Sequence, residues 1–367
     1  VVPVEAPTAD PDWESSKAMK TGASLANASS PATVPGYRIT RKVYEGSKTV
    51  VFRAVSLDNP DFKVIIKVLG SEFPTPQDIA RLKHEYSILN RLDLDGVPRI
   101  VGLERYRNGL ALVLEDVGAE PLRQRLDRNP LSVSEFLPLA GKLAEILTRL
   151  HAKNIIHKDI NPKNLVQSQS DEMVQIIDFG LAMEMVGRQE DIAPTGGMEG
   201  TLPYMSPEQT GRMNRPVDYR TDFYSLGATF YEMVCGRPPF DAVDRSELVH
   251  CHLAVEPTHP QERNPEVPKV LSDLIMRLLA KNAEDRYQSA RGLKADLDRC
   301  AQSWSEAKNI PEFSLGEMDV SDRFHIPQKL YGRDRDVAIL MDSFERVAQG
   351  YKEMMLVAGY AGVGKTS

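Results

Sequence analysis

The hydrophobic periodicity of the chain changes at about residue 121, and this change limits the folds that are possible. Before it, short apolar runs rich in β-branched residues are separated by turn residues, which predicts antiparallel strands. After it, apolar residues recur at spacings of three and four, which predicts amphipathic helices. We therefore expect an α+β fold in which a β-rich lobe precedes a helical lobe.

The predicted elements comprise five strands with one helix among them, and five helices after them. The strands are expected at 37–43, 49–56, 63–69, 100–106 and 110–115, and the helix among them at 76–92. The later helices are expected at 134–153, 219–234, 246–254, 269–280 and 290–299.

The two ends of the chain differ from this pattern. Residues 1–36 are rich in Pro, Ala, Ser and Thr and lack an apolar period, so we expect a disordered leader. Residues 301–330 show little periodicity and are expected to be a linker, followed by a helix at 334–349 and a strand at 354–358. Because the chain opens on Val1 rather than Met, we interpret it as a piece of a longer protein.

The composition excludes several classes of function. There are 45 basic and 52 acidic residues, a formal charge of −7, which argues against electrostatic binding to nucleic acid or anionic membranes. Three cysteines are too few for a disulfide framework and fit a reducing compartment. No run approaches the 18 or so apolar residues of a membrane span. We therefore expect a cytoplasmic location, with no nucleic acid partner and no membrane segment.

Two polar motifs follow the first long predicted helix. The first reads His-Lys-Asp at 157–159 with Asn164 five residues after the Asp, and the second reads Asp-Phe-Gly at 178–180. Phosphoryl transfer needs a carboxylate that accepts a hydroxyl proton and oxygen ligands for Mg²⁺. In this order and at this spacing, the motifs resemble those of the eukaryotic-type Ser/Thr protein kinases.

The resemblance implies a two-lobed protein kinase domain over residues 37–300. The β-rich N-lobe would span about 37–116 and the helical C-lobe about 117–300. It implies transfer of the γ-phosphate of ATP to a Ser or Thr hydroxyl of a protein substrate, with ATP and Mg²⁺ as cofactors, in signal transduction.

The same resemblance assigns the catalytic residues. Asp159 would accept the hydroxyl proton, while Asn164 and Asp178 would bind Mg²⁺. Lys67 would hold the α- and β-phosphates and pair with Glu85 of the following helix. The apolar residues on both sides of Lys67 also indicate a buried strand, in which a lysine needs an anionic partner.

Further nucleotide contacts are implied in the N-lobe and at its end. Gly46 and Val51 would cover the nucleotide, and the backbone groups of Glu115 and Val117 would bind adenine. Within the N-lobe, the glycine-rich loop at 43–51 keeps only the central one of the three glycines usual in the family. Lys48, in this loop, is therefore an additional candidate for a phosphate contact.

The activation segment and its support are also implied by the resemblance. Thr195 is the candidate phosphorylation site, and Thr201 lies near the end of the segment. Glu208 is expected to pair with Arg286, and Asp222 at a helix start is expected to brace the backbone of the catalytic loop.

Two departures in the catalytic loop keep a second function open. Lys158 replaces the arginine before the catalytic Asp and loses its bidentate geometry. Asn161 replaces the lysine expected two residues after Asp159, and Lys163 is the nearest basic residue. The alternative is a pseudokinase, or a regulatory module that binds nucleotide without transferring phosphate.

The C-terminal sequence carries a second nucleotide motif. Gly359, Gly364, Lys365 and Thr366 form a phosphate loop of the form G-x-x-x-x-G-K-[ST] after an apolar run. The segment 331–367 resembles the start of an AAA/STAND-type ATPase, truncated before its remaining strands, so we expect an incomplete P-loop α/β unit. A kinase joined to such an ATPase resembles bacterial multi-domain sensor kinases. The downstream ATPase and sensory modules would then be its partners, to which the kinase domain relays.

Overall fold

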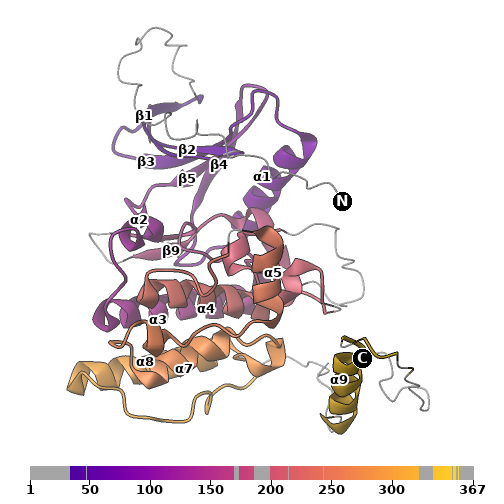
Figure 1. The fold of residues 1–367 in the computed structure, drawn as a ribbon. Coiled ribbons are helices and arrows are strands. Elements are labelled where there is room, and N and C mark those ends of the chain that lie inside the picture. The colour runs from indigo at the N-terminus through magenta and orange to yellow at the C-terminus, as the bar shows by residue number, and fades with distance from the viewer. Residues whose placement is uncertain are drawn as a thin grey trace, which may run out of the picture.

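The computed structural model describes residues 34–46, 48–168, 173–185, 199–213, 215–242, 244–321, 334–348, 350–352 and 354. It has the two lobes that the change in periodicity predicts, with the β-sheet of the N-lobe next to a predominantly helical C-lobe (Figure 1). The α+β fold class is therefore confirmed.

The N-lobe is a five-stranded antiparallel sheet with one helix. The strands are β1 (Tyr37–Glu45), β2 (Thr49–Ser56), β3 (Lys63–Leu69), β4 (Ile100–Tyr106) and β5 (Gly109–Glu115), in the spatial order β1-β2-β3-β5-β4, and the helix is α1 (Pro76–Leu89). Val64, Ile66 and Val68 alternate on one face of β3 and are buried in the N-lobe core. This alternation places Lys67 on the opposite face, toward α1.

Helix α1 begins and ends where local chemistry dictates. Thr75 is its N-cap and exchanges hydrogen bonds with Asp78 in a capping box, and Pro76 occupies the first turn. The helix ends at Leu89, three residues before its predicted end. Glu85 is buried on the face that α1 turns toward β3.

The C-lobe is built on long helices with short strands between them. The helices are α2 (Leu122–Leu126), α3 (Val133–Ala152), α4 (Arg220–Cys235), α5 (Arg245–Ala254), α6 (Pro260–Arg263), α7 (Lys269–Leu278) and α8 (Ala290–Ala307). The short strands pair as β6 (Glu120–Pro121), β8 (Leu165–Gln167) and β9 (Val174–Ile176), and as β7 (Ile155–Ile156) with β10 (Met183–Glu184). The catalytic-loop motif lies between β7 and β8, and this arrangement places it at the junction of the lobes.

The prediction of a linker from residue 301 is wrong for the described part of that segment. Helix α8 continues to Ala307, and residues 308–321, which we call the C-terminal strap, pack on the C-lobe. Ile310 is buried, and the Asp319 carboxylate accepts hydrogen bonds from the backbone nitrogens of Gln288 and Ser289, both at 2.8 Å. The strap therefore belongs structurally to the C-lobe.

Beyond the strap, helix α9 (Asp334–Ala348) forms at the predicted place. Residues 1–33 of the predicted leader, the predicted strand at 354–358 except for residue 354, and the P-loop at 359–366 lie outside the described residues. The last residues assigned to the leader belong to the N-lobe, because Val34 is buried in its core. Within the part of the chain that the structure describes, no helix is both long enough and apolar enough to span a bilayer.

Candidate active site

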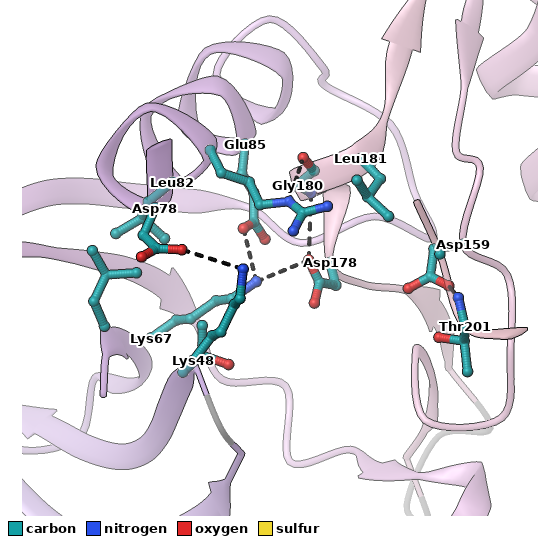
Figure 2. A pocket seen from close by; sticks show the side chains of 14 residues that line it. Lys48, Lys67, Asp78, Leu82, Glu85, Asp159, Asp178, Gly180, Leu181 and Thr201 are labelled. Carbon is teal, nitrogen blue, oxygen red and sulfur yellow. Dashed lines mark hydrogen bonds and ion pairs between the residues drawn. The ribbon is translucent and has the colours of Figure 1, made fainter. Parts of the chain in front are cut away.

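A cavity of about 250 Å³ lies between the lobes and gathers charged side chains from distant parts of the chain. Figure 2 shows Lys67, Glu85 and Asp178 on one side of it and Asp159 with Thr201 on the other. The residues that line it are Lys48, Thr49, Lys67, Leu69, Asp78, Arg81, Leu82, Glu85, Asp159, Asp178, Gly180, Leu181, Gly200 and Thr201. Three cations and four carboxylates thus share one space.

Lys67 joins the N-lobe to the Asp-Phe-Gly motif. Its Nζ lies 2.8 Å from Glu85 Oε2 and 2.9 Å from Asp178 Oδ1, so the expected pair with Glu85 is present. Burial would lower the pKa of Lys67, but Asp178 and Glu85 outweigh this effect and raise it, which keeps the ammonium charged. The Glu85 side chain is only 3% exposed, whereas that of Asp178 is 43% exposed and available to a ligand.

Asp178 is held in an uncommon backbone conformation. Its φ of 68° lies in the left-handed region, and its side chain accepts a hydrogen bond from the Gly180 nitrogen at 3.4 Å. Burial would raise the pKa of Asp178, but the Lys67 ammonium outweighs burial and holds the pKa below its usual range. The next residue, Phe179, is fully buried against the His157 ring, with 4.8 Å between ring centroids, and this packing fixes the motif.

Asp159 faces the cavity from the catalytic loop. The Thr201 backbone nitrogen donates to Asp159 Oδ1 at 2.8 Å, and Asn164 Nδ2 donates to Asp159 Oδ2 at 2.9 Å. Burial raises the pKa of the Asp159 carboxyl, an effect that the hydrogen bonds from Thr201 only partly offset. The carboxylate is therefore oriented and more basic than an exposed aspartate, as a proton acceptor requires.

The backbone of the catalytic loop is held by hydrogen bonds to Asp222 at the start of α4. Asp222 Oδ2 accepts from the His157 nitrogen at 3.0 Å, and Oδ1 accepts from the Lys158 nitrogen at 2.9 Å. Lys158 has a φ of 68°, so these bonds hold a strained backbone. His151 Nε2 lies 2.9 Å from the same carboxylate. The expected bracing of the loop by Asp222 is present.

The end of the activation segment is anchored in the C-lobe by a buried ion pair. Arg286 Nη1 and Nη2 donate to the two oxygens of Glu208 at 2.7 and 2.9 Å, the bidentate pair expected from the sequence. Burial would raise the pKa of Glu208, but Arg286 and the Thr221 hydroxyl outweigh burial and lower it. Thr201, whose nitrogen contacts Asp159, lies just before this anchor. Thr195 lies outside the described residues.

Neither Gly46 nor Val51, the nucleotide contacts expected in the N-lobe, is among the described residues that line the cavity. Val51 lies on β2 directly opposite Lys67, and Gly46 lies in the turn before β2, where its nitrogen donates to the Thr49 carbonyl at 2.9 Å. Glu115 and Val117 lie at and after the end of β5, and neither lines the cavity as the described residues define it. The cavity is therefore lined by the charged residues of the site and not by the residues expected to contact adenine.

The Asp178 carboxylate in the cavity and the Asn164 amide, which bonds to the cavity residue Asp159, offer oxygen ligands that fit Mg²⁺ bound together with a nucleotide. Asn164 Nδ2 makes both contacts to Asp159, so the amide oxygen is the atom available to a cation. Within the described part of the chain, no three His, Cys, Asp or Glu side chains form a metal cage. Mg²⁺ commonly takes one or two protein ligands and completes its shell with phosphate and water oxygens. Asp178 and Asn164 match that requirement.

Several contacts of the site had no signal in the sequence. The Asn161 amide nitrogen donates to the Asp159 carbonyl at 3.0 Å and to Thr201 Oγ1 at 3.2 Å. Arg81 Nε donates to the Gly180 carbonyl at 3.3 Å, and Asp78 lies 3.6 Å from Lys48. A helical face with an arginine and an aspartate is ordinary, so only the tertiary structure places these side chains in the cavity.

Comparison with known proteins agrees with this geometry. A protein kinase domain model matches residues 37–297, and an AAA ATPase domain model matches residues 329–367. A hybrid signal transduction histidine kinase of Dictyostelium discoideum is 41% identical over 46% of this chain and 5% of its own length.

Bacterial serine/threonine kinases match a larger share of the chain. A serine/threonine-protein kinase of Myxococcus xanthus is 34% identical over 73% of this chain and 32% of its own length. A probable serine/threonine-protein kinase of Clostridium acetobutylicum is 29% identical over 73% of this chain and 40% of its own length. The matches thus span between 5% and 40% of the length of these three relatives. The chain belongs to the protein kinase family, and the sequence after its kinase domain matches an AAA ATPase domain.

Proposed function

We propose that this chain transfers the γ-phosphate of ATP to a Ser or Thr hydroxyl of a protein substrate, as a kinase in signal transduction. The observation that carries the proposal is the shared cavity, in which the Asp159 carboxylate lies opposite the Lys67–Glu85–Asp178 cluster. One side offers a proton acceptor and the other a cation with oxygen ligands, which are the parts that phosphoryl transfer requires.

Each residue has a defined part in this reaction. The substrate hydroxyl oxygen forms a bond to the γ-phosphorus while the bond from that phosphorus to the bridging oxygen of ADP breaks. Asp159, oriented by Thr201, accepts the hydroxyl proton. Lys67, oriented by Glu85, binds the α- and β-phosphates.

The remaining roles concern Mg²⁺ and the adenine ring. Asp178 and Asn164 would hold Mg²⁺, which neutralises charge on the phosphates when it is bound. The backbone of Glu115 and Val117 would bind adenine, and Gly46 with Val51 would cover the nucleotide. The relatives named as serine/threonine kinases favour Ser or Thr over Tyr as acceptor.

The test is labelling with γ-labelled ATP and Mg²⁺ in the presence of a generic Ser/Thr substrate. Labelling is expected with the natural sequence and is expected to fall by more than about 1,000-fold in Asp159→Asn, because the amide cannot accept the proton. Asp95→Asn is the matched control, since Asp95 is exposed, pairs with Arg149 at 3.6 Å and is not among the described residues that line the cavity. Equal labelling by Asp159→Asn and the natural sequence would contradict the proposal.

A second candidate function is nucleotide binding without transfer. It is favoured by the replacement of a catalytic-loop lysine with Asn161. It is also favoured by the glycine-rich loop of the N-lobe, which retains Gly46 as the only one of its three usual glycines. Thermal stabilisation by Mg²⁺-ATP with no labelling under any condition would establish this pseudokinase.

We also propose that residues 331–367 begin a downstream ATPase to which the kinase domain relays, as in a bacterial multi-domain sensor kinase. The match of residues 329–367 to an AAA ATPase domain supports this proposal. In the full-length protein, Lys365→Ala is expected to change the rate of kinase labelling. Identical rates with and without this substitution would exclude the relay.

A further inference from the structure

The catalytic loop lacks a cation where the transferred phosphate must lie. Asn161 occupies the position two residues after Asp159, is 1% exposed, and uses its amide nitrogen on the Asp159 carbonyl and Thr201. Lys163, the nearest lysine, is exposed and is not among the described residues that line the cavity. Lys158, the other lysine of the loop, is paired with Glu199 at 3.7 Å and also does not line the cavity as the described residues define it. Neither lysine of the loop is therefore placed to meet the charge that develops on the γ-phosphate.

Lys48 reaches the same cavity from the N-lobe. It lies in the turn between β1 and β2, and its backbone is anchored because the Gly70 nitrogen donates to the Lys48 carbonyl at 2.8 Å. Its side chain lines the cavity with Lys67 but is 66% exposed. Figure 2 shows Lys48 and Lys67 reaching into the cavity, with Lys48 joined to Asp78. Lys48 thus combines a fixed backbone with an exposed side chain.

The partner of Lys48 is fixed, but the ion pair is weak. Asp78 is held in the first turn of α1 by the Thr75 hydroxyl at 2.6 Å. These hydrogen bonds with Thr75 lower the pKa of Asp78, so it stays ionised. Lys48 Nζ lies 3.6 Å from Asp78 Oδ1, and exposed pairs of this length contribute little. A phosphate with two charged oxygens competes readily for such a lysine.

We propose that Lys48 leaves Asp78 and binds the γ-phosphate of ATP, supplying the cation that Asn161 does not. This inference rests on the proposed function, since it assigns a residue to the same ATP site. Asp78 then serves as the holding position of Lys48 when no γ-phosphate is present. Arg81 is the competing cation, but its Nε is engaged with the Gly180 carbonyl at 3.3 Å.

The test compares two nucleotides that differ only at the γ-position. Binding of ADP and of the β,γ-imido analogue of ATP, each with Mg²⁺, is measured by titration calorimetry. Lys48→Ala is expected to weaken the analogue by about 10- to 100-fold more than ADP, because a charged hydrogen bond is lost only with the analogue. Lys48→Arg is expected to retain most of the difference. Lys42→Ala, which removes an exposed lysine paired with Glu45 on β1, is the matched control.

The outcomes decide the proposal. An analogue-to-ADP affinity ratio in Lys48→Ala equal to that of the natural sequence would overturn it. So would a selective loss in Arg81→Ala with none in Lys48→Ala, which would assign the cation to α1. Asp78→Asn keeps an acceptor for Thr75 and frees Lys48, so it is expected to bind the analogue at least as tightly as the natural sequence. Weaker binding would contradict the holding role.

Failure of this inference is distinguishable from failure of the proposed function, because the binding assay requires no phosphate transfer. A chain that binds the analogue through Lys48 but never labels a substrate supports the inference and rejects the kinase. In an active chain, Lys48→Ala is expected to lower kcat by about tenfold or more and to leave the KM for the protein substrate unchanged.

Discussion

The two walls of the cavity are built in opposite ways. The C-lobe wall carries the catalytic loop, whose supporting residues Asp222, His157 and Asn161 are each at most 1% exposed, and hydrogen bonds fix this loop before any ligand binds. The opposite wall carries the glycine-rich loop of the N-lobe, and we call it the glycine-rich-loop wall. In this loop Tyr44 is 49% exposed and the Lys48 side chain is 66% exposed. The comparison teaches that the catalytic loop is fixed by buried hydrogen bonds, whereas the loop between β1 and β2 keeps exposed side chains that a ligand can order.

The largest expected effect is on the C-lobe wall, in Asp222→Ala. The substitution leaves the backbone nitrogens of His157 and Lys158 without their acceptor and removes the partner of His151. We expect the free energy of unfolding to fall by about 3–5 kcal/mol. We expect labelling to fall at least about 100-fold, because the catalytic loop is displaced.

Urea unfolding and labelling at a temperature where the variant is folded measure the two effects separately. Asp244→Ala removes an exposed N-cap from α5 and is expected to cost only about 1 kcal/mol, with labelling unchanged. If Asp222→Ala were as active as Asp244→Ala, the C-lobe wall would not be held by this carboxylate.

The next effect tests how far the support of the C-lobe extends along the chain. The Asp319 side chain in the C-terminal strap is 1% exposed and accepts from the nitrogens of Gln288 and Ser289. Asp319→Ala leaves these groups without their acceptor, so we expect a loss of about 2–3 kcal/mol in unfolding free energy. Glu317→Ala, in the same strap but exposed and paired with Arg299, is expected to cost less than about 0.5 kcal/mol. Equal costs would mean that the strap is only loosely attached.

The difference between the walls also explains what could be predicted from sequence. Periodicity was sufficient for the sheet and the long helices. Motif spacing pointed to Asp159 and Asp178, which line one cavity, and to Asn164, which bonds to Asp159. The resemblance selected the pair between Lys67 and Glu85, and the apolar run around Lys67 independently indicated an anionic partner.

What could not be predicted depends on contacts between segments far apart in the chain. The strap was interpreted as a linker because it is held through one carboxylate and a few apolar side chains without a period. The bond from Asn161 to Thr201 spans 40 residues, and the side-chain positions of Lys48 and Asp78 follow from how α1 packs against the sheet. Local sequence carries no information on such distances.

A smaller effect is expected from pH, again on the C-lobe wall. Burial raises the pKa of Asp159, and a protonated carboxyl cannot accept the substrate proton. As the pH falls, kcat/KM is therefore expected to decline about tenfold per unit, beginning above the value of about 3.9 that is ordinary for Asp. A pH–rate profile for labelling measures this decline. A profile that stays flat down to the ordinary aspartate range would show that Asp159 is not the proton acceptor.

The smallest effect is expected on the glycine-rich-loop wall, in Gly46→Ala. An added Cβ would lie 2.5 Å from the Tyr44 hydroxyl, the far end of an exposed side chain that can swing away. We expect a change within about 0.5 kcal/mol in unfolding free energy. Gly227→Ala in α4 is the matched substitution in the C-lobe, where the new Cβ would lie 2.6 Å from Leu278 Cβ, which is close to the backbone and cannot move alone.

This second substitution is expected to cost about 1–3 kcal/mol, because α4 and α7 must separate. Urea unfolding of both variants compares one chemical change in the two environments. Equal losses of unfolding free energy would show that the glycine-rich loop is packed as tightly as the C-lobe. The contrast between the walls would then reflect exposure alone, and a side chain that moves toward the γ-phosphate, as proposed for Lys48, would lose its physical basis.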